Sequence, residues 1–229
     1  MLDRDRSLLI ACAIVIEEVL PWLPPTISYR SLDFGLHLRP ENLRQTLQEI
    51  IDAGPDFRTI ILGYGLCSMA VVGLTANRCR LIIPRVDDCI ALFLGSQTAY
   101  SEQSRHEPGT YYLTKGWIEV SDTLLGEYEQ LSSQYGQERA RYIMQVMLKH
   151  YRRLAYIHTG HSHAERYRVY AQQTAAHFDL RYEEIQGNDA LVRKMIYGPW
   201  DEDFVIVPEG QTVNYTDFVR SDAALTTIK

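Results

Sequence analysis

The stretch TIILGYGLCSMAVVGL, residues 59–74, joins two apolar runs through a glycine turn and a single cysteine. The first run belongs to a strand that we predict at Arg58–Leu62, and Gly63-Tyr64-Gly65 then ends it. Cys67 opens the second run, Ser68–Leu74, which we predict to be helical. A strand, a turn and a helix in succession are typical of a parallel sheet with crossover helices.

The same alternation runs through the first 95 residues and resumes after residue 150. Strands are predicted at Leu8–Ile14, Thr26–Leu36, Arg58–Leu62, Arg80–Pro84, Arg153–His158, Leu180–Gln186 and Asp203–Pro208. Helices are predicted at Glu17–Leu23, Pro40–Gly54, Ser68–Leu74, Cys89–Leu94, Ala164–Phe178 and Asp189–Tyr197. Between the two halves, residues 106–120 predict a loop with a short extended piece, and Ser121–His150 predicts a long helical region broken near Gly136.

These elements predict an α/β fold with a Rossmann-like, mostly parallel sheet and βα repeats in both halves around a helical insertion. We expect a single domain over residues 1–229. Its finer division is a cysteine-bearing lobe at 1–105 and a second lobe at 151–229, with the insertion at about 106–150. The pattern leaves open whether the two halves share one sheet.

The bulk composition excludes several classes of protein. With 46% hydrophobic and 23% charged residues the chain is of the globular type, and its net charge of -6 argues against nucleic acid, which calls for a basic surface. No apolar stretch approaches the ~20 residues of a membrane helix. Asp3 and Asp5 interrupt the positive region of a signal peptide, and the four cysteines lack the density of a disulfide framework, so we expect a reducing cytoplasm.

The strongest signal is the position of the cysteines relative to the strands. Cys12 lies near the C-terminal end of the first predicted strand, His37 follows the second, Cys67 follows the third, and Asp87-Asp88-Cys89 follows the fourth. Ligands of open α/β sheets bind beyond the carboxyl ends of the strands, so these groups are expected at one edge. Cys79 precedes the fourth strand and is expected at the opposite edge, where it serves as an internal control.

Two chemistries fit this arrangement, and a third interpretation needs none. Thiolates and an imidazole are usual ligands of zinc and of iron–sulfur clusters. A thiol at the start of a helix can instead be a nucleophile, because the helix dipole favours the thiolate; Cys67 and Cys89 both open predicted helices. Buried cysteines also often only pack. The predicted ligands are Cys12, Cys67, Cys89 and, as a fourth, His37, with Asp88 and Glu17 in supporting positions.

Other residues carry weaker signals. Arg85 can bind an anion or pair with a neighbouring aspartate, and Tyr111 and Trp117 can line a cofactor pocket or pack the insertion onto the sheet. Glu18, next to Glu17, is expected at an exposed helix start. The loop HTGHSHAERY contributes three further histidines, whose part in the site stays open: His158, His161 and His163.

The ordered motifs IAC-x4-EE, LH-x2-P, LGYGLCS-x4-GL, IPR-x-DDCI-x3-LGS and PGTYYLTKGWIE resemble a domain-of-unknown-function family of bacteria and methanogenic archaea. Genes of that family often neighbour corrinoid-dependent methyltransferases of the trimethylamine and glycine-betaine type. The resemblance extends from Cys12 to about Gly210. The positions that the resemblance implies are shared with the family are Cys12, His37, Cys67, Asp88, Cys89 and the PGTYYLTKGW segment. The family commonly has a histidine where this chain has Asp87.

Three functions follow as hypotheses. The first is a cytoplasmic metal- or iron–sulfur-binding protein accessory to corrinoid-dependent methyl transfer, with a corrinoid protein or methyltransferase as its partner. The second is a metal-free enzyme in which Cys67 is the nucleophile. The third is a non-catalytic partner protein whose cysteines belong to the core.

Overall fold

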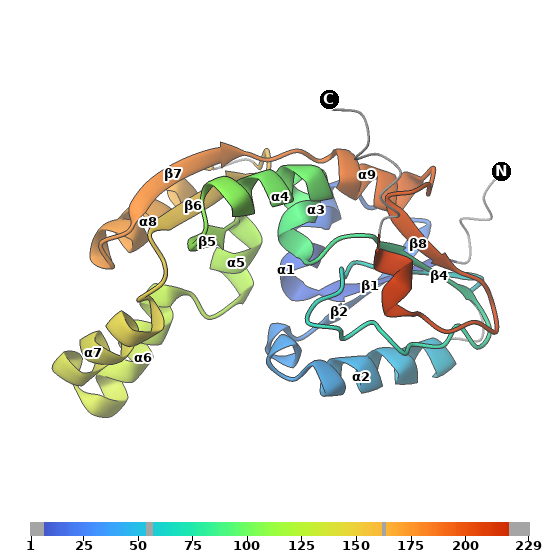
Figure 1. The fold of residues 1–229 in the computed structure, drawn as a ribbon, viewed down its shortest axis with the longest axis horizontal. Helices are drawn as coiled ribbons and strands as arrows, with labels where there is room; N and C mark the ends of the chain where they lie inside the picture. The colour runs from blue at the N-terminus through green and yellow to red at the C-terminus, as the bar shows by residue number, and fades with distance from the viewer. Residues whose placement is uncertain (1–6, 54–56, 162–163, 220–229) are drawn as a thin grey trace, which may run out of the picture. The chain divides into compact units, whose positions relative to one another are not determined.

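The computed structural model describes residues 7–53, 57–161 and 164–219. In this part of the chain the fold is mixed α/β with mostly parallel strand pairing, which confirms the predicted fold class (Figure 1). The chain forms two compact units, each discontinuous in sequence. The first contains Leu23–Cys89 with the segments before Cys12 and after Arg193, and the second contains Cys12–Trp22 and Ile90–Arg193.

The first unit is built on a sheet with the strand order β2-β1-β3-β4-β8. Its strands are β1 (Ser7–Cys12), β2 (Ile27–Leu32), β3 (Thr59–Leu62), β4 (Arg80–Pro84) and β8 (Phe204–Val207). β3 pairs in parallel with β1 and with β4, whereas β8 runs antiparallel to β4. β1 and β3 are buried along their whole length, which explains their unbroken apolar sequences.

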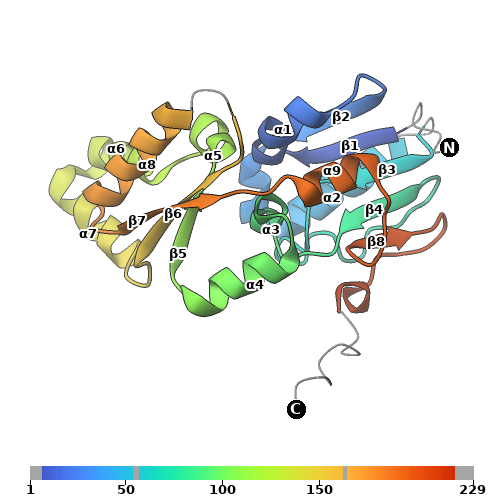
Figure 2. The same ribbon diagram turned by 90° about the horizontal axis from the view of Figure 1, so that it is seen from above.

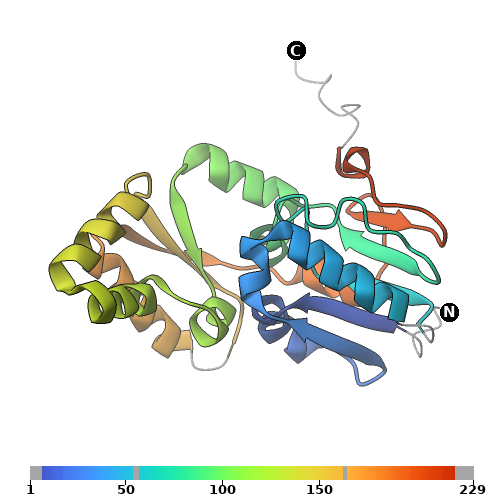
Figure 3. The same ribbon diagram turned by 90° about the horizontal axis from the view of Figure 1, so that it is seen from below.

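Helix α2 (Pro40–Ala53) runs along one face of this sheet (Figure 1, Figure 3). Proline is favoured at the first position of a helix because its missing N–H would have no partner there. The residues that α2 buries recur at helical spacing, which gives the helix its apolar side: Leu43, Leu47, Ile50 and Ile51.

The second unit has its own sheet, in which β5 (Thr110–Leu113), β6 (Arg153–His158) and β7 (Arg181–Gln186) are all parallel. Helix α8 (Ala164–His177) contacts β6 and β7, and the hairpin of α6 (Leu124–Tyr135) and α7 (Gln137–Met147) packs beside it (Figure 2). The core between them consists of Leu113, Leu124, Met144, Leu148, Leu154, Tyr156, Tyr167, Ala171, Ala175 and Leu180. The two halves therefore do not share one sheet.

The other helices are α1 (Ala13–Val19), α3 (Cys89–Leu94), α4 (Gln97–His106), α5 (Lys115–Val120) and α9 (Ala190–Tyr197). Short 3-10 turns occur at Leu20–Trp22, Phe34–Leu38 and Tyr215–Phe218. None of the helices in the described part of the chain is both long and apolar enough to cross a membrane.

Several predicted elements are confirmed, and others are wrong. β4, α3 and β6 have the predicted bounds, and the break near Gly136 is present between α6 and α7. The first strand ends at Cys12 instead of Ile14, because α1 begins directly after it. Helix α4 was not predicted because it buries no residue and so lacks an apolar stripe; Ser96, which caps it by accepting from the Ala99 amide at 3.0 Å, was the available signal.

The helix predicted at Ser68–Leu74 is absent. Residues 73–76 instead bond to the C-terminal segment: the Gly73 amide donates to the Val213 carbonyl at 2.9 Å, and the Val213 amide donates to the Leu74 carbonyl at 2.8 Å. Backbone groups satisfied in this way are no longer available for a helical ladder. A contact about 140 residues away in sequence thus overrides the local apolar pattern.

Arg153, the first residue of β6, is a charged residue in the interior of the second unit, with 2% of its surface exposed. Its guanidinium donates to Thr110 Oγ1 at 2.9 Å, to Glu183 Oε2 at 3.0 Å and to Gln103 Oε1 at 2.8 Å. These bonds connect β6 to β5, to β7 and to α4. A buried charge is tolerated only when its donors are satisfied in this way.

We expect Arg153→Lys to lower the free energy of unfolding by about 2 kcal/mol, because an ammonium cannot reproduce the three-way fork of the guanidinium. Arg152→Lys is the matched control. Arg152 donates only to the carbonyls of Lys149 and Tyr151 on the surface, so we expect a change below about 0.5 kcal/mol. Urea unfolding of both variants measures this, and equal losses would contradict the role of the Arg153 bonds.

Candidate functional site

The loops that follow β3 and β4 lie side by side in the first unit. The strands are parallel, with Thr59 opposite Arg80 and Ile61 opposite Ile82, so both loops leave the sheet at the same edge. The Leu66 amide donates to the Val86 carbonyl at 2.9 Å. The Cys67 amide then donates to the Asp87 carbonyl at 3.0 Å, which places the Cys67 backbone beside a residue only two positions before Cys89.

Gly65 allows the two loops to approach this closely. A Cβ atom at this position would lie 2.4 Å from the carbonyl oxygen of Val86 and 2.8 Å from its Cγ2. No side chain fits at these distances without separating the loops. The GYG sequence before Cys67 is therefore needed for the pairing of the loops as well as for the turn.

Cys67 begins a left-handed turn. The φ angles of Cys67, Ser68 and Met69 are 44°, 56° and 72°, and the Ala70 amide donates to the Cys67 carbonyl at 3.2 Å. Non-glycine residues avoid this region at a cost of roughly 1–2 kcal/mol each. Such strain persists only where the surroundings enforce it, and it concentrates at functional sites. Because no helix follows Cys67, the helix dipole cannot activate its thiol, and that part of the nucleophile argument is wrong.

Cys89 does begin a helix, α3, as predicted, and its side chain is half-buried. Cys67 is more buried, with 9% of its surface exposed. The structure thus places Cys67 and Cys89 on two bonded, neighbouring loops of one unit. Of the two aspartates before Cys89, Asp87 is exposed and Asp88 is half-buried.

His37 lies near the same edge. Its ring faces Tyr64, in the loop after β3, with 5.7 Å between the ring centroids, and its Nδ1 lies 3.1 Å from the Phe34 carbonyl oxygen. Burial lowers the pKa of His37, and the bond to Phe34 opposes this only in part. The imidazole is therefore neutral at neutral pH, which is the form that binds metals.

The other two cysteines are both buried. Cys12 is the last residue of β1 and belongs to the second unit; burial raises the pKa of its thiol, although the amides of Ile14 and Val15 act in the opposite direction. Cys79 precedes β4, at the end of the strand opposite to Cys89, and burial raises the pKa of its thiol to about 11. Both groups are protonated thiols at neutral pH.

The predicted cofactor-binding residues have structural contacts. Arg85 follows β4, and its amide donates to the Asp203 carbonyl at 2.8 Å, next to β8. Tyr111 and Trp117 pack against the core of the second unit, in edge-to-face contact with Tyr151 and Phe93 respectively. Both aromatic rings therefore pack within the second unit.

No preformed metal site of three or more ligands is present in the described residues, where His, Cys, Asp and Glu side chains form no group of three that can hold an ion. Of the loop histidines, His158 lies 3.4 Å from Gln186 Oε1, and His161 bonds to Glu18. His163 lies outside the described residues. The ligand set predicted from the sequence, including Cys67 and Cys89, thus stays a prediction.

Glu18 is buried, with 3% of its surface exposed. The exposed helix start predicted for it is therefore wrong. Its carboxylate accepts from the Gly116 amide at 2.8 Å, from Thr159 Oγ1 at 2.6 Å and from His161 Nε2. A Cβ on Gly116 would lie 2.6 Å from the Ile14 carbonyl oxygen. Glycine therefore lets α5 lie against α1, where its amide reaches Glu18.

Two opposing effects act on the pKa of Glu18. Burial disfavours the charged form, but the bonds from His161, Thr114, Thr159 and the Gly116 amide outweigh it, so the pKa lies below its ordinary value of 4.5. The neighbouring Glu17 pairs with Lys115 at 3.0 Å. Together the two carboxylates attach α1 to the segment after β5, and Glu18 also holds the loop after β6.

We expect Glu18→Gln to lower the free energy of unfolding by about 2–4 kcal/mol near neutral pH, because a neutral amide cannot satisfy the surrounding donors. Since the folded-state pKa of Glu18 lies below 4.5, its contribution is complete above that pH and is lost as the pH falls through the folded-state value. The difference between wild type and variant should therefore shrink on acidification.

Urea unfolding of both proteins across that range measures the difference. Glu17→Gln is the matched control, and as a partly exposed ion pair it should cost less than about 1 kcal/mol. An equal loss in the two variants, or a Glu18 effect independent of pH, would contradict the buried network.

Gly65→Ala tests the pairing of the cysteine loops. We expect a loss of about 1–3 kcal/mol in stability, because the new Cβ forces the Val86 carbonyl away. We also expect faster alkylation of Cys67 by iodoacetamide, because separating the loops exposes its buried thiol. Cys79, which precedes β4 at the end of the strand opposite to the paired loops, is the internal control in mass-spectrometric mapping. Unchanged Cys67 alkylation, or an equal increase at Cys79, would be inconsistent with the described contact.

Comparison with known proteins now adds the family. A family model described as "Protein of unknown function (DUF1638)" matches residues 31–196, a segment that includes His37, Cys67 and Cys89 but not Cys12. No curated protein and no solved structure matches the chain significantly. Because the match spans more than half of the 229 residues, the predicted resemblance to a domain-of-unknown-function family is confirmed: the chain belongs to the DUF1638 family.

Proposed function

We propose that this protein binds a thiophilic metal ion or an iron–sulfur cluster through Cys67 and Cys89, in support of corrinoid-dependent methyl transfer. The observation that carries the proposal is the pair of backbone bonds that holds the loops after β3 and β4 together, from Leu66 to Val86 and from Cys67 to Asp87. Two cysteines on bonded loops at the carboxyl edge of a parallel sheet stand where such folds bind their ligands.

The donor chemistry supports a soft metal. Thiolates favour zinc, copper(I) and iron–sulfur clusters, whereas carboxylates and carbonyls favour harder ions. A bound metal supplies the positive charge that keeps such sulfurs deprotonated. The residues of this chain contribute the rest: backbone bonds hold the two cysteine-bearing loops together, and Gly65 permits their close approach, which supports a ligand shared by both thiols.

Closed zinc sites have four ligands, so the pair needs partners. His37 is the first candidate in the same unit, because it is neutral and, in the tautomer that donates from Nδ1 to Phe34, its Nε2 keeps a lone pair. The proposed site is confined to the first unit, with Asp88 as a supporting residue; Cys12 and Glu17, which belong to the second unit, stay predictions from the sequence. The methyltransferase or corrinoid partner rests on the gene neighbourhood that the family resemblance implies.

We expect anaerobically purified protein to contain about one metal ion or cluster per chain. Elemental analysis by ICP-MS, with a UV–visible spectrum of the same sample, distinguishes colourless zinc from an iron–sulfur chromophore. Cys67→Ser and Cys89→Ser should each lose most of the metal, because each removes a thiolate from the pair.

Cys79→Ser is the matched control and should keep full metal content, because Cys79 is a buried thiol at the opposite end of β4. Metal-free wild-type protein, or a loss in Cys79→Ser as large as in Cys67→Ser, would contradict the proposed site.

A second function, a metal-free enzyme with Cys67 as nucleophile, is favoured by one observation. Three consecutive left-handed residues start at Cys67, and backbone strain of this kind often presents a reactive side chain. Selective alkylation of Cys67 in metal-free protein, at a rate that rises with pH below the range of ordinary thiols, would support this alternative. If the protein contains no metal and none of its cysteines is alkylated selectively, the third function, a non-catalytic partner protein, is favoured.

A further inference from the structure

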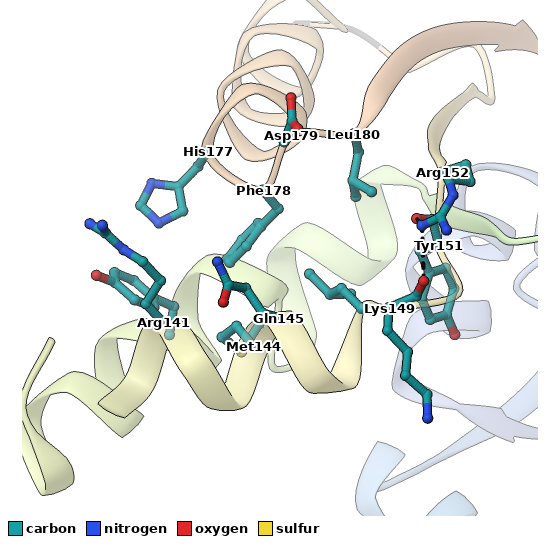
Figure 4. Close-up of a pocket in the computed structure, with 12 residues that line it drawn as sticks. Arg141, Met144, Gln145, Lys149, Tyr151, Arg152, His177, Phe178, Asp179 and Leu180 are labelled. Atoms are coloured by element: carbon teal, nitrogen blue, oxygen red, sulfur yellow. Dashed lines mark hydrogen bonds between the residues drawn. The ribbon is translucent and has the colours of Figure 1, made fainter. Parts of the chain in front are cut away.

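A cavity of about 800 Å³ lies in the second unit, between the C-terminal half of α7 and the segment that connects α8 to β7. Its volume falls in the range of small-molecule sites. Figure 4 shows Phe178 in the middle of the groove, with Arg141 at one end and Arg152 at the other. The groove lies at the amino ends of the parallel strands β6 and β7, since Arg152 precedes β6 and Leu180 precedes β7.

More basic than acidic side chains line this cavity, although the chain as a whole is acidic. The protein has a net charge of -6, yet the lining includes Arg141, Lys149 and Arg152 and a single carboxylate, Asp179. None of these three cations forms an ion pair with any described carboxylate; Arg152 is held only by the carbonyls of Lys149 and Tyr151.

Most of the other basic residues of the unit pair with described carboxylates, although Arg105 and Arg139 do not. Those that pair with carboxylates are Lys115, Arg153, Arg166, Arg168, Arg181 and Arg193. A unit that neutralises most of its cations but places two unneutralised guanidinium groups, Arg141 and Arg152, at the ends of one cavity presents a local positive potential there; the Lys149 side chain extends away from Phe178 (Figure 4). Such a potential attracts an anion.

One wall of the cavity is aromatic. The His177 ring lies 4.8 Å from the Tyr128 ring and 4.7 Å from the Phe178 ring, measured between centroids, and Tyr128 meets Phe178 edge to face at 6.2 Å. Phe178 is only half-buried, so part of its ring faces the groove. Rings held by one another in this way offer a rigid surface on which a flat heterocycle can stack.

We propose that this groove is a binding site for a nucleoside polyphosphate. The base stacks on the wall formed by Tyr128, His177 and Phe178, and the phosphates pair with the cations of the groove. Guanidinium groups match phosphate oxygens in bidentate geometry, and Arg141 and Arg152 supply them here. The site lies entirely within the second unit and does not depend on the cysteine loops of the first.

Isothermal titration of the whole protein with ATP tests the proposal, with adenosine and inorganic triphosphate as partial ligands. We expect ATP to bind more tightly than either, because only ATP offers both a base and phosphates. Arg141→Gln and Arg152→Gln should each weaken ATP binding by about tenfold, the loss of one charge-assisted contact, and leave adenosine binding unchanged. Phe178→Leu should weaken ATP and adenosine but not triphosphate.

Arg139→Gln is the matched control. Arg139 is on the same helix as Arg141 and likewise has no carboxylate partner among the described residues, but it lies over the Tyr135 ring and outside the cavity. We expect it to leave ATP binding unchanged. A loss equal to that of Arg141→Gln would reduce the effect to general charge and overturn the site. So would the absence of ATP binding up to about 1 mM, or equal affinity for ATP and triphosphate.

Discussion

The parallel pairing of β3 with β1 on one side and β4 on the other is the constraint on which the candidate site depends. Parallel strands deliver their carboxyl ends to one edge, so the loops after β3 and β4 start from neighbouring points. They then continue the pairing beyond the strands through the bonds from Leu66 and Cys67 to Val86 and Asp87. Gly65 is the residue that permits this second, loop-level pairing, since any Cβ there would meet the Val86 carbonyl.

The second unit buries two charged side chains in its interior. Arg153 and Glu18 are nearly inaccessible, and each has hydrogen bonds to several elements. Charges held in this way are costly to leave unpaired, so each acts as a specific connection: Arg153 between three strands and α4, and Glu18 between α1, α5 and the loop after β6. The cations that line the α7 cavity differ from Arg153 and Glu18, because they form no ion pair with a described carboxylate. This difference is the reason for proposing the cavity as a binding site.

The two proposals divide the chemistry between the units. The cysteine loops offer soft donors at the carboxyl edge of one sheet, and the α7 groove offers positive charge and aromatic surface at the amino edge of another. The proposed recognition chemistry differs, because thiolates select metals by softness, whereas the proposed groove ligand is an organic anion recognised by charge and stacking. The two candidate sites are made of residues from different units, so each is tested by substitutions in its own unit.

The amino-acid sequence by itself determined the fold class, most strand positions and the strand-end placement of the cysteines, because buried parallel strands are short apolar runs and glycines mark their ends. It could not determine Ser68–Leu74, which is apolar enough for a helix but bonds instead to a segment near residue 212. Glu18 was equally out of reach: a glutamate after an apolar run predicts exposure, and only the donors from Gly116, Thr159 and His161, all about 100 residues or more away, make its burial favourable. Local pattern decides which residues are strand or helix, whereas long-range hydrogen bonds decide where a polar group can be buried, and those exist only once the chain has folded.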